Sequence, residues 1–216
     1  MKIKTLSKSR YNRTNVTSSV VVPSGTQKAI FGYGYTTVVV SMTNLVSNTG
    51  VVATDTTGVG TARRDLAAAG YGTDKAIFGY GYTGSNVSMT NLVSNTGVVA
   101  TDTTGVGTAR NSLAAARYGT DKAIFGYGYT TVNVSMTNLV SNTGVVATDT
   151  TGVGTARNSL AAARYGGDKA IFGFGYSSAN VSITNLVSNT GVVATDQASL
   201  TGTARYGLAA AGYSTT

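Results

Sequence analysis

Apolar and polar positions alternate over short stretches of this chain, and the same stretches return several times. The clearest is residues 75–82, in which Phe78, Tyr80 and Tyr82 alternate with aliphatic residues and glycines. A period of two places these three aromatic side chains on one face of an extended strand. The pattern predicts a β-strand with an aromatic face and a small-residue face. We expect the aromatic residues of one unit to pack on bare glycines of the next.

Three neighbouring stretches also predict strands. Residues 66–69 are small and apolar, residues 87–93 are rich in β-formers, and residues 98–102 form a short Val-containing run. Clusters of turn-forming residues separate them, including the Asn-Thr-Gly that ends at Gly97. The alternation slips near Asn91, which predicts a β-bulge at that position. Together these stretches predict one small antiparallel sheet of four strands.

This group of strands recurs with a fixed period. The motif Lys-Ala-Ile-Phe-Gly begins at positions 28, 75, 122 and 169, so each copy starts 47 residues after the last. The pattern predicts an all-β fold, a four-repeat β-propeller with four-stranded antiparallel blades. A basic N-terminal arm at 1–18 precedes a single repeat domain at 19–216. Its units are expected at 19–65, 66–112, 113–159 and 160–207, with a closing strand at 208–214.

A second fold is compatible with the same repeats. Residues 111–117 suit a short capped helix, since Ala is the best helix former and Asn or Ser is a good N-cap. The alternative fold is a β-rich solenoid with a short helix in each repeat. The last copy lacks the cap, because Tyr206 and Gly207 precede Leu208 there. This difference favours the propeller.

A propeller of these units has two routes to ring closure. Residues 208–211 form a further small-residue strand that can pair with residues 28–35, or Val20, Val21 and Val22 can complete the first blade. Either route leaves one β-forming segment unpaired. An unpaired strand favours assembly with another chain.

The order of basic residues, small-residue strands and glycine pairs is itself informative. The basic residues before the small-residue strands are Arg63, Arg110, Arg157 and Arg205. The glycine pairs occur as Gly-Tyr-Gly at 32–34, 79–81 and 126–128, and as Gly-Phe-Gly at 173–175. This order resembles the kelch repeat over about four-fifths of the chain, and the resemblance implies a β-propeller. In composition, the repeats also resemble repeat-containing structural proteins of tailed phages of aquatic bacteria.

The composition excludes most catalytic chemistry. The chain has no His, Cys, Trp or Glu, and its eight acidic residues are all Asp. The commonest general acid–base group, the thiol nucleophile and most zinc ligand sets are therefore absent. The remaining reactive types recur once in each repeat, which is typical of a structural role. We expect a non-enzymatic protein with no catalytic residue, no cofactor and no metal site.

The positive charge is concentrated at the N-terminus. The formal net charge is +8, and the acid-free arm supplies much of it. The basic residues of the arm are Lys2, Lys4, Lys8, Arg10 and Arg13. We expect the arm, together with Val20, Val21 and Val22, to dock on a neighbouring subunit, and we expect no nucleic-acid partner except through this arm. No apolar run is long enough to span a bilayer, so no membrane insertion is expected.

Differences between the repeats collect in two places, the loop after the aromatic strand and the residue pair after the basic residue. In a four-stranded blade both emerge on the same face, and loops on a rigid scaffold often carry binding. This face is a candidate carbohydrate-binding surface with one site per blade. Its candidate ligand-binding residues are Tyr35, Tyr82, Tyr129, Tyr176, Asn86, Asn133 and Asn180.

These features favour a structural component of a virion or other extracellular assembly, made in a host cytoplasm and docked through its arm or an unpaired strand. Its expected partners are other virion or assembly proteins, with a second copy of the chain as a further candidate. The alternative is a lectin-like propeller whose partner is a surface glycan.

Overall fold

The computed structural model describes residues 27–198 and 202–213, and every regular element in these ranges is a β-strand. The predicted all-β class is therefore confirmed. The helix alternative is wrong at residues 114–118, which form a strand of five residues paired with its neighbour. No helix in the described ranges is long and apolar enough to cross a membrane. The basic arm and Val20, Val21 and Val22 lie outside the described residues.

Eleven strands occur in the described part of the chain. They are β1 (Ala29–Tyr35), β2 (Val39–Val46), β3 (Ala67–Tyr71), β4 (Lys75–Gly79), β5 (Thr90–Val93), β6 (Ala114–Tyr118), β7 (Lys122–Tyr129), β8 (Asn133–Val140), β9 (Ala161–Tyr165), β10 (Lys169–Gly173) and β11 (Thr184–Val187).

The strands form four small antiparallel sheets, one in each repeat unit. The first sheet contains β1 and β2, and the others follow the orders β3-β4-β5, β6-β7-β8 and β9-β10-β11. The predicted fourth strand of each unit is reduced to isolated bridges, such as Thr90 with Thr103 and Val93 with Val99. The predicted turn before it is present, since Gly97 N donates to Ser94 O at 3.0 Å.

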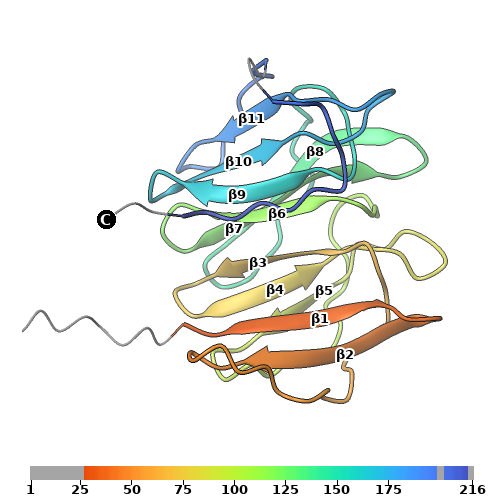
Figure 1. Ribbon diagram of the computed structural model, residues 1–216, viewed down its shortest axis with the longest axis vertical. Coiled ribbons are helices and arrows are strands. Elements are labelled where there is room, and N and C mark those ends of the chain that lie inside the picture. The colour runs from red at the N-terminus through yellow and green to blue at the C-terminus, as the bar shows by residue number, and fades with distance from the viewer. Residues whose placement is uncertain (1–26, 199–201, 214–216) are drawn as a thin grey trace, which may run out of the picture.

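The sheets follow one another along the long axis of the molecule, from β1 and β2 at one end to β9, β10 and β11 at the other (Figure 1). The first strands of successive sheets adjoin, β3 with β6 and β6 with β9. Among the described residues β1 pairs with β2 alone, and residues 208–211 belong to no strand. The closed ring of a four-bladed propeller is therefore not confirmed.

The irregularity in each unit lies at the Gly-aromatic-Gly motif. In the third unit the register between β7 and β8 shifts between Gly126 and Gly128, and Tyr127 between them has a φ of 62°. Left-handed backbone is uncommon for an aromatic residue and is typical of a β-bulge. At Asn91 the pairing of β4 with β5 is regular, so the bulge predicted there is wrong. The same left-handed conformation recurs at Tyr33, Tyr80 and Phe174.

The bulge places successive aromatic side chains on opposite faces of a sheet. Phe78 meets Tyr33 of the preceding unit, with ring centroids 5.2 Å apart. Tyr80 meets Phe125 of the following unit, also at 5.2 Å. The prediction that Phe78 and Tyr80 share a face is wrong, because one extra residue reverses the alternation. Every inner sheet consequently presents an aromatic ring to both of its neighbours.

Aromatic rings pack on glycines between the sheets. A Cβ on Gly79 would lie 2.6 Å from Phe125 Cζ, and a Cβ on Gly126 would lie 2.6 Å from Phe172 Cζ. Only glycine allows a ring to approach the backbone so closely. The predicted packing of aromatic residues on bare glycines is confirmed, although each Phe uses a glycine of the preceding unit. The apolar core therefore lies between successive sheets.

Candidate binding surfaces

A buried arginine lies at each junction between units. Arg110, in the link between the second and third units, has no solvent-exposed surface. Its Nε donates to Tyr127 O (2.8 Å) and its Nη2 donates to Asn138 Oδ1 (2.7 Å). Its guanidinium also lies over the Tyr80 ring, 4.2 Å from the centroid, where the ring quadrupole attracts a cation. Arg110 thus connects an aromatic ring of one unit to the backbone of the next.

An aspartate reinforces the same junction from the following unit. Asp149 accepts hydrogen bonds from Thr108 N (2.9 Å), Thr108 Oγ1 (2.7 Å) and Asn138 Nδ2 (2.9 Å). Partial burial acts to raise the pKa of Asp149, but these hydrogen bonds and the charge of Arg110 outweigh it and hold the pKa below its ordinary value. Burial in turn lowers the pKa of Arg110, although arginine stays charged at any pH of interest.

The other two inner junctions repeat this arrangement. The equivalent arginines are Arg63 and Arg157, the equivalent asparagines are Asn91 and Asn185, and the equivalent aspartates are Asp102 and Asp196. The arginines are recognisable in the sequence as repeated basic residues, but this network was not predicted. An available signal was the Asn that precedes Leu and Val in each third strand, because a buried amide needs partners.

The predicted tyrosines lie where each second strand meets the link between units. Tyr129 is paired through its backbone with Asn111 of the link and with Asn133 of the following loop. The loop after the aromatic strand and the link between units therefore lie on one edge, as predicted. We name this edge the tyrosine–asparagine edge. It contains Tyr35, Tyr82, Tyr129, Tyr176, Asn86, Asn133 and Asn180, with Asn111 and Asn158 from the links.

Most asparagines of this edge are engaged with a neighbouring unit. Asn86 Nδ2 donates to Thr130 O (2.6 Å), and Asn86 Oδ1 accepts from Asn111 Nδ2 (2.6 Å). Asn133 repeats these contacts with Ser177 O and Asn158. Asn180, in the last unit, is exposed. The amides of Asn86 and Asn133 therefore hold adjacent loops together.

The four tyrosines differ in their surroundings. Tyr35 is the most exposed, at 60%, while Tyr82 is half-buried. The structure brings these two together, because the Arg64 guanidinium lies 5.3 Å from the centroid of each ring. Tyr176 instead meets Tyr206 edge-on, with centroids 5.9 Å apart. The edge therefore offers a series of related but unequal aromatic positions.

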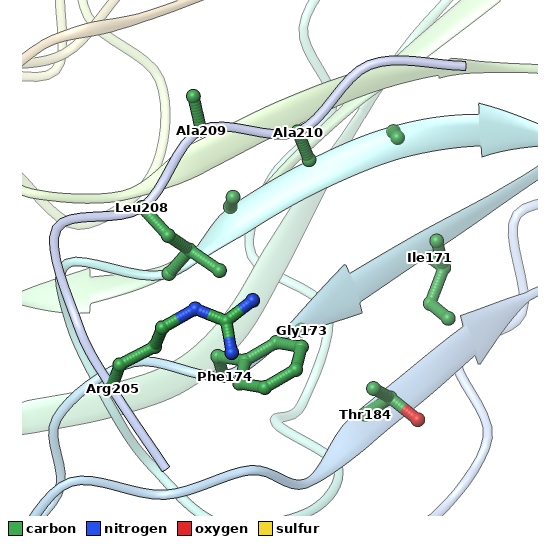
Figure 2. A pocket seen from close by; sticks show the side chains of 10 residues that line it. Ile171, Gly173, Phe174, Thr184, Arg205, Leu208, Ala209 and Ala210 are labelled. Atoms are coloured by element: carbon green, nitrogen blue, oxygen red, sulfur yellow. The ribbon is translucent and has the colours of Figure 1, made fainter. Parts of the chain in front are cut away.

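A hollow of about 220 Å³ lies on the outer face of the fourth sheet. Gly173, Ile171 and Thr184 line it on one side, and Leu208 and the alanines that follow line it on the other (Figure 2). Arg205 lies over the ring of Phe174, 4.2 Å from its centroid. The hollow is the place that an aromatic ring fills between the inner sheets.

The opposite end of the molecule has a protruding side chain in place of a hollow. Phe31 is 62% exposed, whereas Phe78, Phe125 and Phe172 at the same position of the other units are buried.

The described residues contain no group of three or more side chains suited to hold a metal ion. No protein-family model and no curated protein matches the chain.

Proposed function

We propose that the protein is a non-enzymatic structural component of a virion or another extracellular assembly. The observation that carries the proposal is the repeated junction, in which Arg, Asn, Asp and Tyr side chains are used to hold successive sheets together. In Arg110, for example, all three nitrogens donate to protein acceptors. Buried polar groups that are hydrogen-bonded within the protein rigidify a scaffold, and they are poorly available for chemistry.

We infer that the four sheets are successive blades of a kelch-like propeller whose ring a single molecule leaves open. Support comes from the face-to-face packing of the sheets and from the contacts of β3 with β6 and β6 with β9. The order of arginines and glycine pairs, which resembles the kelch repeat, supports the same proposal. The basic arm, together with Val20, Val21 and Val22, would attach the scaffold to a neighbouring protein.

The test uses purified particles from cells that make the protein. Cryo-EM and immunolabelling of the particles are expected to locate the repeat array on their surface. A chain that lacks residues 1–22 should fold, as judged by circular dichroism, but should fail to join the particle. Absence of the protein from every released particle would contradict the proposed location. Full incorporation of the shortened chain would contradict docking through the arm.

The tyrosine–asparagine edge supports a second candidate function, carbohydrate binding with one site per blade. Exposed aromatic rings beside amide groups are suited to the apolar face and hydroxyl groups of a sugar. On a glycan array, Tyr176→Ala, next to exposed Asn180, should weaken any binding, whereas Tyr213→Ala, at a 92% exposed position away from the edge, should not. A chain that binds no glycan at high density would leave only the structural function.

A further inference from the structure

The two ends of the repeat array carry complementary halves of one more junction, and we propose that they bind each other in separate copies of the chain, head to tail. The head is the outer face of the first unit and includes Phe31, the carbonyl oxygen of Tyr33, Asn44, Gly50 and Asp55. The tail is the outer face of the fourth unit and includes Tyr165, Gly173, Leu186 and residues 202–213. This contact would exist whether or not the assembly is a virion, so it does not rest on the proposed function.

The first complementary pair is an aromatic ring and its glycine. At the inner junctions a Cβ on the glycine would approach the ring of the next unit closely, as at Gly126, where Phe172 Cζ would be 2.6 Å away. At the tail, a Cβ on Gly173 would meet only Thr184 Cγ2, at 3.4 Å. At the head, Phe31 is 62% exposed. The head has the ring without its glycine, and the tail has the glycine without its ring.

A second apolar pair involves the turn after the third strand. A Cβ on Gly144 would lie 2.9 Å from Leu92 of the preceding unit and 3.0 Å from its Tyr71. The equivalent glycine of the head, Gly50, has nothing within 4 Å. The equivalent tyrosine of the tail, Tyr165, is 38% exposed, although Tyr71 is only 2% exposed. Both differences follow if Tyr165 packs on Gly50 of a second copy.

The polar groups of the junction are also split between the two ends: the tail carries the arginine, and the head carries its acceptors. Arg205 lies over Phe174 and donates Nη1 to Thr203 O at 3.0 Å, as Arg110 does with Tyr80 and Thr108. In the inner junctions Nε and Nη2 of the arginine reach a carbonyl and an asparagine of the following unit. The counterparts of these acceptors are Tyr33 O and Asn44, both in the head.

Asp55 of the head corresponds to Asp149 of the inner junction. Asn44 Nδ2 donates to Asp55 Oδ1 at 2.8 Å, just as Asn138 Nδ2 donates to Asp149 Oδ1 at 2.9 Å. In the inner junction Asp149 also accepts from a threonine of the preceding link. The counterpart of that threonine is Thr203, which is exposed in the tail. Charge complementarity therefore accompanies the apolar fit.

The two ends also carry the two members of one strand pair. Within residues 27–198 and 202–213, the first sheet has no counterpart of the small-residue strand with which the other sheets begin. Residues 209–213 have the same sequence as β3, Ala-Ala-Ala-Gly-Tyr, yet they belong to no strand. In the register of β3 with β4, where Ala69 lies opposite Ile77, Ala211 would lie opposite Ile30 of a second copy. Addition of a strand to an open edge supplies backbone hydrogen bonds.

The partner is a second copy because one molecule holds its two ends apart. The first and fourth sheets lie at opposite ends of the row (Figure 1). A head-to-tail contact is heterologous, so it builds a closed ring or an open filament according to the rotation at each contact. The segment Val20, Val21 and Val22 is a competing strand for the head, but in the 47-residue register Val16 stands at the position of Arg63 and Ser24 at the position of Tyr71.

The test measures the mass of the full chain by light scattering over a range of concentrations. Concentration-dependent multiples of 21.9 kDa are expected. Phe31→Ala and Gly173→Ile should each weaken self-association by at least about tenfold. The first removes the aromatic ring, and the second fills the space at Gly173 that the ring would occupy. The open space at Gly173 lets the folded chain accept the isoleucine. Val132→Ala, which truncates a side chain that is 63% exposed in the third unit, is the matched control and should change nothing.

Disulfide trapping distinguishes a second copy from ring closure, because the chain has no cysteine of its own. Differently tagged Ile30→Cys and Ala211→Cys chains, mixed and oxidised, are expected to form a mixed dimer, whereas Ile30→Cys with Val132→Cys should not. A chain that stays at 21.9 kDa at every concentration would overturn the proposal. So would oligomers unaffected by both end variants, or lost only on deletion of residues 1–22. A disulfide that forms only within a doubly substituted molecule would also overturn it.

Discussion

The ring of Phe125 lies edge-on to the ring of Tyr80 in the preceding sheet, with centroids 5.2 Å apart and an interplanar angle of 63°. The Tyr33–Phe78 and Tyr127–Phe172 pairs have nearly the same geometry. Such edge-to-face contacts place the positive edge of one ring on the negative face of the other. Because one local contact is repeated at three junctions, inner and terminal copies of a residue can be compared directly.

Arg110→Ala is expected to lower the free energy of unfolding by about 3 kcal/mol, because it leaves buried Asn138 and the carbonyl of Tyr127 without their donor. Arg205→Ala removes an exposed side chain at the same repeat position and should cost less than about 1 kcal/mol. Urea unfolding at low protein concentration measures both. Equal losses in the two variants would show that the buried network adds nothing to the inner junction.

Gly126→Ala is expected to destabilise the protein by about 1–3 kcal/mol, because its Cβ would lie 2.6 Å from Phe172 Cζ. Gly173→Ala adds the same methyl group at the end of the array, where the nearest atom is 3.4 Å away. We expect that change to be neutral or slightly stabilising. Thermal melting followed by circular dichroism compares the two. A neutral Gly126→Ala would contradict the packing of the ring on that glycine.

The protein should lose stability at alkaline pH through its buried tyrosines. Burial raises the pKa of Tyr80 and of Tyr127 from 10.0 to about 12. Below pH 10 both phenols are neutral in the folded and unfolded chains, so their contribution is fully present. Between pH 10 and pH 12 the unfolded chain releases these protons first, and the free energy of unfolding falls.

Tyr127→Phe tests this effect, since Phe174 already occupies the same position in the fourth unit. Loss of the hydrogen bond from Tyr127 Oη to Val153 O should cost about 1 kcal/mol at neutral pH. The midpoint of alkaline unfolding should nevertheless move to higher pH, as followed by circular dichroism and tyrosinate absorbance. Tyr213→Phe, at a 92% exposed position, is the control. An unchanged midpoint in Tyr127→Phe would rule out the burial effect.

Acid should weaken the junctions through their aspartates. The pKa of Asp149 is held below its ordinary value of 3.8, so its contribution is present above that pH and is lost as the pH falls through the lower, folded-state value. Asp149→Asn should reduce the free energy of unfolding at neutral pH by about 1 kcal/mol and flatten its acid dependence. Asp55→Asn, at the exposed end, should have little effect in the monomer. Identical acid profiles for the wild type and Asp149→Asn would contradict this role.

Much of the unit could be predicted from the sequence. The period of the repeats, the all-β class and the positions of the turns followed from alternation and from Gly and Asn, because these are local properties of the backbone. The bulge could not be placed correctly. Tyr80 looks like a strand residue in the alternation, but its φ is 64° and its N donates to Met89 O at 3.0 Å. This pairing between strands is not encoded in the alternation.

The candidate sites, too, could be predicted from the sequence only in part. The varied loops in the sequence indicated the tyrosine–asparagine edge. They did not show that Asn86 forms hydrogen bonds with Asn111 and with Thr130 O. It also identified Arg110 as a repeated basic residue without indicating that the residue is buried. Those contacts join residues far apart in the chain, and only the packing of one sheet on the next brings them together.

The sequence by itself determined that one β-sheet unit is made four times, since strand periodicity and turn chemistry act within a few residues. The tertiary structure alone decided that the junctions between units hold the buried charges, and that the first and last units expose opposite halves of such a junction. The physical reason is that burial depends on a neighbouring unit. Phe31 and Phe125 belong to copies of the same motif, yet one is 62% exposed and the other is fully buried, because in the described part of the chain a preceding sheet covers Phe125 and none covers Phe31.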